Sequence, residues 1–112
     1  RKEYTATDAG RRELRRWLTD TSPRIVNRDE SMLRVFFLGQ IEPAQAADYL
    51  REQAEDARWR HGELVSLENS MDWTQDTLAE FGRLALEFGQ RYMVMRREWA
   101  EWALDQLESR NP

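Results

Sequence analysis

Apolar residues recur every three or four positions through most of this chain, which is the spacing of amphipathic α-helices. The spacing predicts four helices, over residues 8–19, 29–38, 43–69 and 75–109. The segments between them are short and contain proline, glycine or serine, which interrupt helices. The expected fold class is therefore all-α, with two long antiparallel helices at the C-terminal end.

The first expected helix has signals at both ends. Thr7 is positioned to cap its N-terminus, and Asp8 lies in the first turn, where a carboxylate interacts favourably with the helix dipole. Pro23 disfavours helical structure at the residue before it, so the helix should stop shortly before this proline. Residues 23–27 are expected to form a linker.

The second expected helix is apolar on nearly all sides, so it should be central to the core. Gly39 follows it and is expected to end it as the residue beyond the C-cap. The apolar residues of this helix are Met32, Leu33, Val35, Phe36, Phe37 and Leu38.

The third helix is expected to begin near Pro43 and to bury one stripe of small and aliphatic residues. The stripe consists of Ala46, Ala47, Leu50, Ala54, Ala57, His61, Leu64 and Leu67. In the fourth helix, Gly82 and Gly89 each cost about 1 kcal/mol relative to alanine. They are expected to allow close approach of another helix, or else to mark a local kink.

The length of the fourth helix has a consequence for assembly. A helix of about 34 residues is roughly 50 Å long, whereas a compact domain of about 100 residues has a radius of gyration near 13 Å. Its stripe of large side chains therefore extends beyond any globule this chain forms alone, and we expect a homodimer. The residues expected to form the dimer interface are Leu84, Phe88, Tyr92, Met95, Trp99 and Trp102.

The N-terminal residues follow another pattern. Lys2, Tyr4 and Thr7 suit a short strand with a polar face, yet this strand has no partner in the sequence, and a lone strand is unstable in water. Either the segment is frayed or the chain is part of a larger protein.

The same residues carry a resemblance to a known family. The spaced motif Lys2, Tyr4, Thr7, Gly10, Arg11, Leu14 and Trp17 resembles the last wing strand and following helix of PadR-like transcriptional regulators. Ala6 departs from the pattern, because the family usually has a larger apolar residue there. Two further segments, Leu33–Gly39 and Leu84–Gly89, resemble the start and the last long helix of the family's C-terminal domain of the virulence-activator-alpha type.

The resemblance implies that residues 1–22 are the remnant of a winged helix-turn-helix and that residues 23–112 form a helical dimerisation and effector domain. It implies a cytoplasmic bacterial regulator that binds DNA. The regulator would form a homodimer through a coiled-coil-like domain. Arg1 and Lys2 would contact the DNA backbone in the intact protein. Such regulators often release DNA on binding phenolic or multidrug-like compounds, so a small aromatic effector is expected.

The charge distribution agrees with DNA contacts near the N-terminus. Residues 1–28 carry eight Arg or Lys against four acids, whereas residues 29–112 carry nine against seventeen. The cluster of Arg11, Arg12, Arg15 and Arg16 is either a solvated helix face or a set of phosphate contacts. The recognition helix is absent, so this chain alone should bind DNA weakly and without specificity.

Nothing in the sequence suggests catalysis or a cofactor. The chain has no cysteine, and His61 is its only histidine, so no metal-ligand pair is available. His61 is either packed or in contact with an effector, and the five tryptophans are either core and interface anchors or the walls of an aromatic cavity. We take His61 and Trp59 as candidate effector residues. No apolar run is long enough to cross a membrane. The alternative function is a helical-bundle interaction module with no role on DNA.

Overall fold

The computed structural model describes residues 7–23 and 29–110. The described residues form helices and no strands, which confirms the all-α class. The elements are α1 (Asp8–Asp20), α2 (Glu30–Phe36), the 3₁₀-helix η1 (Leu38–Gln40), α3 (Pro43–Ser70) and α4 (Thr77–Arg110). The expected wing strand lies outside the described residues, except for Thr7. The chain divides between Met32 and Leu33 into two units, which we describe one at a time.

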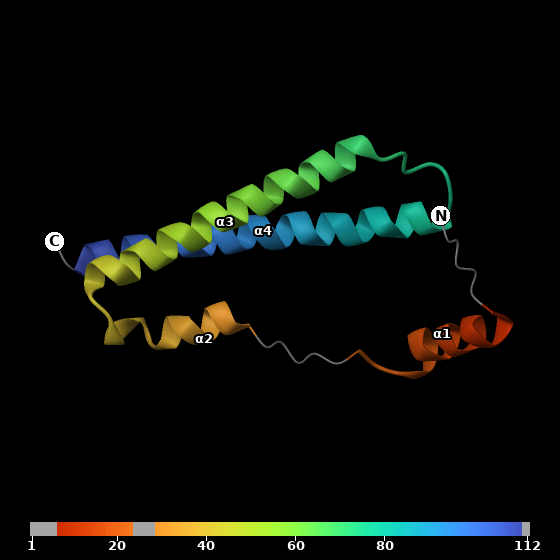
Figure 1. The fold of residues 1–112 in the computed structure, drawn as a ribbon, viewed down its shortest axis with the longest axis horizontal. Helices are drawn as coiled ribbons and strands as arrows, with labels where there is room; N and C mark the ends of the chain where they lie inside the picture. The colour runs from red at the N-terminus through yellow and green to blue at the C-terminus, as the bar shows by residue number, and fades with distance from the viewer. Residues whose placement is uncertain (1–6, 24–28, 111–112) are drawn as a thin grey trace. The chain divides into compact units, whose positions relative to one another are not determined.

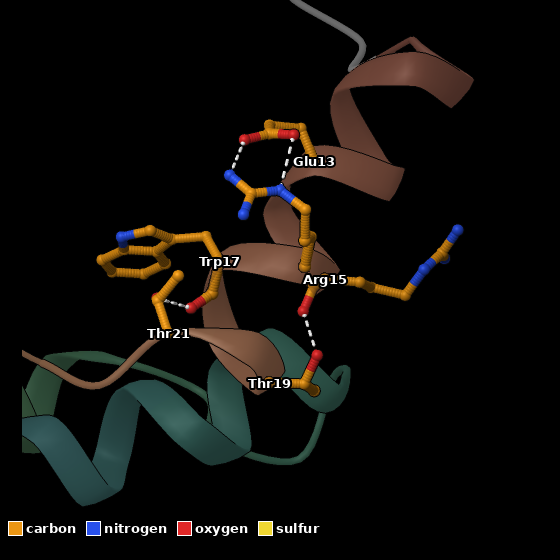
Figure 2. A network of polar contacts seen from close by, with 6 residues as sticks. Glu13, Arg15, Trp17, Thr19 and Thr21 are labelled. Atoms are coloured by element: carbon orange, nitrogen blue, oxygen red, sulfur yellow. Dashed lines mark hydrogen bonds and ion pairs between the residues drawn. The ribbon is translucent and has the colours of Figure 1, made fainter.

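The first unit contains α1, whose ends are fixed as the sequence predicts. The hydroxyl of Thr7 accepts a hydrogen bond from the backbone N–H of Gly10 at 3.0 Å, which caps the N-terminus. At the other end, the hydroxyls of Thr19 and Thr21 donate to backbone carbonyls one turn earlier (Figure 2). Trp17 belongs to the last turn of α1, so the Thr21 hydroxyl adds a donor to one of the last four carbonyls of the helix.

The second unit is dominated by an antiparallel hairpin of α3 and α4 (Figure 1). The ion pairs between the two helices show the direction. Arg51 in α3 pairs with Glu108 in α4 at 3.3 Å, and Arg58 pairs with Glu101 at 3.3 Å. Residue numbers therefore increase along one helix in the direction in which they decrease along the other. These pairs are exposed and contribute little to stability.

The hairpin is held together by a small core of mostly small residues. Four of the six buried hydrophobic residues among those described are alanines, so the two backbones can approach closely. Three of these alanines and Leu50 belong to the stripe expected on α3, so the stripe is confirmed in the N-terminal half of this helix. In the C-terminal half, the stripe residue Leu67 is exposed. The six core residues are Ala46, Leu50, Ala54, Ala57, Leu86 and Ala100.

The two glycines of α4 meet different neighbours. A Cβ added at Gly89 would lie 3.2 Å from the Cδ1 of Leu64 in α3, so Gly89 is a position of close helix approach, as the sequence predicts. At Gly82 the added Cβ would lie 3.7 Å from the Trp73 ring, an ordinary contact. The helix runs without interruption through both positions.

The turn between α3 and α4 is closed by side chains. The indole N–H of Trp73 donates to the carbonyl of Glu68 at 2.9 Å. A carboxylate oxygen of Asp72 accepts from both the backbone N–H and the hydroxyl of Thr74, at 3.0 and 2.6 Å. These hydrogen bonds lower the pKa of Asp72, the hydroxyl having the larger effect. Asp76 accepts from the backbone N–H of Ala79 at 2.7 Å and caps the start of α4.

Two predictions for the second helix are wrong. Its residues are not central to the core, since none is buried and Phe36 is 81% exposed. The helix is only seven residues long, and its apolar sides lack enough neighbours within the chain. Gly39 does not end it as a left-handed residue either, because α2 stops at Phe36 and no described glycine has a positive φ. The chain continues into η1 instead.

Candidate interaction site

The six residues expected to form a dimer interface lie on one side of α4, and we call them the aromatic stripe. Its exposed members project away from α3, because helical residues advance by about 100° and the core residues Leu86 and Ala100 occupy the opposite side. Four of the six are more than half exposed within the chain: Leu84 (62%), Phe88 (71%), Met95 (51%) and Trp102 (58%). Tyr92 and Trp99 are half-buried.

The aromatic stripe has the residue spacing of a coiled-coil seam. From Phe88 to Trp102 its members alternate at intervals of four and three, as the a and d positions of a heptad do. Large apolar side chains at such positions pack into the holes of a second helix. The hairpin therefore presents a surface of the kind that pairs with another helix, on the side that α3 leaves uncovered.

Part of the aromatic stripe is ordered within the chain. The Phe88 and Tyr92 rings stack with centroids 6.2 Å apart and an interplanar angle of 11°. The guanidinium of Arg96 lies 5.6 Å from the centroid of Tyr92, and its Nη1 donates to the Tyr92 hydroxyl at 2.9 Å. Arg96 also donates to Gln53 of α3 at 3.4 Å. These contacts fix one edge of the stripe against the hairpin and leave its apolar face open.

An open cavity of about 510 Å³ lies at one end of the hairpin. Figure 1 shows η1 and the start of α3 at the same end of the hairpin as the C-terminal end of α4. The cavity is lined mainly by apolar side chains, together with the polar groups of Gln106 and Arg110. Two of the wall residues, Trp99 and Trp102, also belong to the aromatic stripe.

The two candidate effector residues lie elsewhere. Trp59 is 63% exposed on α3, and His61 is half-buried on the same helix. Neither lines the cavity. The structure thus brings together Trp99 and Trp102, but it does not bring Trp59 or His61 to them, and an effector role for these two residues stays a prediction.

The basic cluster of α1 is partly neutralised within the helix. Arg16 forms a two-pronged ion pair with Glu13, at 2.6 and 3.1 Å (Figure 2). The pair lowers the pKa of Glu13 and raises that of Arg16. Arg15 extends away from the helix in Figure 2 and has no carboxylate partner among the described residues. Arg1 and Lys2, the expected DNA-backbone contacts, lie outside the described residues.

Sites of two other kinds are absent from the described residues. No group of three or more acidic or histidine side chains could hold a metal ion in the part of the chain that the structure describes. Over the same residues, no helix has both the length and the apolar character needed to span a bilayer.

These features define an α-helical hairpin domain with one uncovered aromatic face. Residues 27–108 match the family model described as virulence activator alpha, C-terminal, and the chain belongs to this family. The resemblance to PadR-like regulators predicted from the sequence is confirmed.

The relatives with known functions are longer than this chain. The negative transcriptional regulator PadR of Bacillus subtilis (strain 168) is 28% identical over 98 residues, covering 87% of this chain and 52% of that protein. The chain thus spans about half the length of this curated relative.

Solved structures of the same relative share the fold. The structure of Bacillus subtilis PadR in complex with operator DNA has a TM-score of 0.75 and 25% sequence identity, and the match covers 93% of this chain and 60% of that chain. The structure of PadR in complex with p-coumaric acid has a TM-score of 0.74 and 23% identity, with 93% and 66% covered.

The sequence leaves open that the tryptophans line an aromatic cavity, but it does not predict where the cavity at the end of the hairpin lies. Its walls come from η1, from the start of α3 and from the end of α4, and no single periodic pattern connects these segments. One signal was present in the sequence, because two tryptophans, Trp99 and Trp102, lie about one turn apart in the C-terminal third of the last helix.

Proposed function

We propose that this chain is the dimerising C-terminal part of a PadR-like transcriptional regulator. The observation that carries the proposal is the aromatic stripe, which α3 leaves uncovered although it holds the largest apolar side chains of α4. Membership of the family supports the same reading. In a homodimer, the stripe of one copy would pack against the other copy and bury these rings.

The size of the stripe is adequate for such an interface. An aromatic side chain has roughly 150–250 Å² of surface, so each exposed ring of the stripe leaves on the order of 100 Å² in contact with water. The face then offers several hundred Å² per copy, which approaches the roughly 800 Å² per partner of a stable interface. Apolar patches of this size on soluble proteins mark interaction sites.

The remaining parts of the proposal concern the intact regulator. We place residues 1–22 at the end of a DNA-binding head and residues 23–112 in the dimerising domain. Arg1 and Lys2 would contact the DNA backbone and add affinity rather than sequence choice. Because one relative was solved with p-coumaric acid, we also propose that this regulator responds to a small aromatic effector. A cytoplasmic location follows from a role on DNA.

Light scattering coupled to size exclusion tests the dimer. We expect the chain to elute as a dimer at micromolar concentration, and the double variant Met95→Glu/Trp99→Glu to elute as a folded monomer, because two buried carboxylates would lack partners. Trp59→Glu is the matched control, since Trp59 is as exposed as the stripe residues but lies on α3. A monomeric wild-type chain would contradict the proposal.

The DNA role is tested separately. The chain alone should bind DNA weakly, with an affinity that falls steeply with salt and does not depend on sequence. A gel shift with operator and scrambled duplexes measures this. Nanomolar, sequence-dependent binding at physiological salt would show that the reading head is within this chain and would overturn the domain assignment.

A further inference from the structure

The segment of α2 and η1 presents an apolar surface that the hairpin does not cover. Val35 and Leu38 line the cavity at the end of the hairpin and are half-buried. Phe36 and Phe37 are instead 81% and 62% exposed, and Leu33 is 59% exposed. The two phenyl rings together leave on the order of 200 Å² in contact with water. Adjacent exposed rings of this kind mark an interaction site.

The start of α4 presents a second uncovered apolar surface. Leu78 is 81% exposed and Phe81 is 60% exposed. Both fall in heptad register with the aromatic stripe, so that one seam with alternating steps of three and four runs from Leu78 to Trp102. We call these positions the heptad seam. The heptad seam consists of Leu78, Phe81, Ala85, Phe88, Tyr92, Met95, Trp99 and Trp102.

The heptad seam is symmetric about position 90, because its residues lie at equal distances before and after this position. In an isologous dimer whose two-fold axis crosses α4 there, the two α4 helices run antiparallel. Leu78 of one copy then lies opposite Trp102 of the other, and Ala85 lies opposite Met95. This pairing sets smaller side chains against larger ones, as well-packed layers require. A parallel pairing would set Trp102 against Trp102 and Ala85 against Ala85, so its layers would be overfilled or empty.

The antiparallel pairing brings the start of one α4 to the cavity of the other copy, because Trp99 and Trp102 line that cavity. Within one chain, Leu78 is 24 positions from Trp102 in an uninterrupted helix, which corresponds to about 36 Å along its axis. The start of α4 therefore reaches a cavity of this kind only in a second copy.

The charges near the two surfaces are complementary. Arg110 is the single charged residue in the lining of the cavity. Asp76 and Glu80 flank Leu78 at the start of α4. Opposite charges that face one another across an interface favour one register over others. The cation of the cavity and these two acids would lie near each other in the antiparallel dimer.

We propose that the cavity is the docking site for the start of α4 of a second copy of this chain. Leu78 of the second copy enters the cavity, and the exposed rings of Phe36 and Phe37 cover its Phe81. The cavity of about 510 Å³ is in the range that holds small-molecule ligands, so it accommodates a leucine side chain. This inference rests on the proposed function, because it adds a contact at each end of the proposed dimer.

The added contacts supply area that the aromatic stripe lacks. The stripe offers several hundred Å² per copy, whereas a stable interface buries roughly 800 Å² per partner. The rings of Phe36, Phe37 and Phe81 each add on the order of 100 Å². The dimer then has a central pairing of two α4 helices and two equivalent end contacts.

Gly39 provides the variant that blocks the cavity. It lines the cavity, its φ is not positive, and a Cβ added there would have nothing within 4 Å. Gly62→Leu is the matched control, because an added Cβ at Gly62 also meets nothing within 4 Å, and Gly62 is not in the cavity lining. We expect Gly39→Leu to raise the dimer Kd at least tenfold and Gly62→Leu to change it less than twofold, as measured by light scattering over a dilution series. Circular dichroism verifies that each variant is folded.

Cross-linking between engineered cysteines tests the geometry directly, because the chain has no cysteine of its own. Gln40 in η1 and Thr77 at the start of α4 are exposed, and neither belongs to the cavity lining or to the heptad seam. We expect a short bismaleimide to convert Gln40→Cys/Thr77→Cys into a covalent dimer. Each single variant should stay uncoupled, since like positions lie at opposite ends of an antiparallel dimer. Gln40→Cys/Trp59→Cys, with its second cysteine on α3, is the control and should also stay uncoupled.

The outcomes separate this inference from the proposed dimerisation. Coupling of Thr77→Cys to itself would show a parallel pairing and overturn the inference. A dimer by light scattering that gives no cross-link in Gln40→Cys/Thr77→Cys, or that Gly39→Leu leaves at wild-type affinity, would also overturn it and would leave the proposed dimerisation standing. A wild-type chain that is monomeric at micromolar concentration would overturn both.

Discussion

The two sides of α4 are built from different residues and are used differently. The side that faces α3 includes Leu86, Gly89 and Ala100, and Ala100 is fully buried. The opposite side carries the aromatic stripe, where Phe88 is 71% exposed. Both sides follow a helical period, and both are apolar. The larger side chains are nevertheless the ones left in contact with water.

This difference shows which contact is made within the chain and which requires a partner. Small residues allow two helices joined by a short turn to pack closely, and they need little surrounding material to be covered. Large rings are buried only when they pack between the side chains of another surface. Because α3 packs against the inner side of α4, it does not cover the rings on the outer side. The inner side should therefore determine whether one chain folds, and the outer side should determine whether two chains associate.

A matched pair of leucine truncations tests this division with the largest expected effect. Leu50 is 2% exposed and packs in the hairpin, whereas Leu84 is 62% exposed in the aromatic stripe. We expect Leu50→Ala to lower the free energy of unfolding by about 2–5 kcal/mol at every protein concentration. Leu84→Ala should instead raise the dimer Kd on the order of tenfold, because an interface contact is lost.

Urea unfolding at several protein concentrations distinguishes the two effects. A loss of stability that depends on concentration is an association effect, since dimerisation stabilises the folded state by mass action. If Leu84→Ala destabilised the chain as strongly as Leu50→Ala and without concentration dependence, the aromatic stripe would be part of the intrachain core. The division between the two sides of α4 would then be wrong.

The same contrast explains what could be predicted from the sequence. The capped ends of α1, the start of α3 at Pro43 and the long last helix follow from local signals, so they were predicted closely. The aromatic stripe was assigned as the apolar side of the last helix because large rings dominate the hydrophobic signal. The inner side, with its alanine and glycine, is weaker in that signal although it makes the intrachain contact.

Burial was harder to predict than helix position. The second helix was expected in the core because it is apolar all round, yet Phe36 is 81% exposed in the chain. Hydrophobicity indicates that burial of a side chain is favourable, but it does not show whether the residues that bury it belong to the same chain. The position of the cavity does not follow from the sequence for a related reason, since its walls come from segments that only the hairpin brings together.

The two glycines of α4 give a smaller test of how tightly the inner side packs. Gly82→Ala should stabilise the hairpin by about 1 kcal/mol, because alanine has the higher helix propensity and its Cβ meets Trp73 at an ordinary 3.7 Å. Gly89→Ala should gain less or lose stability, since its Cβ would lie 3.2 Å from Leu64. Thermal unfolding measures both. Equal stabilisation by the two substitutions would mean that α3 and α4 can separate there at little cost.

The smallest expected effect concerns the turn, which contributes only to the intrachain side of the comparison. Hydrogen bonds from Thr74 hold the pKa of Asp72 below its ordinary value of 3.8. The ionised carboxylate therefore stabilises the fold above about pH 4, and this contribution is lost as the pH falls through the lowered pKa of the folded state. Thr74→Val removes the hydroxyl donor, so its Tm should be below that of wild type at pH 6 and approach it at about pH 2. The difference between the two proteins cancels the titration of other carboxylates, and it should not change with protein concentration. A Tm gap that stayed constant from pH 6 to pH 2 would show that this hydrogen bond does not favour the ionised form.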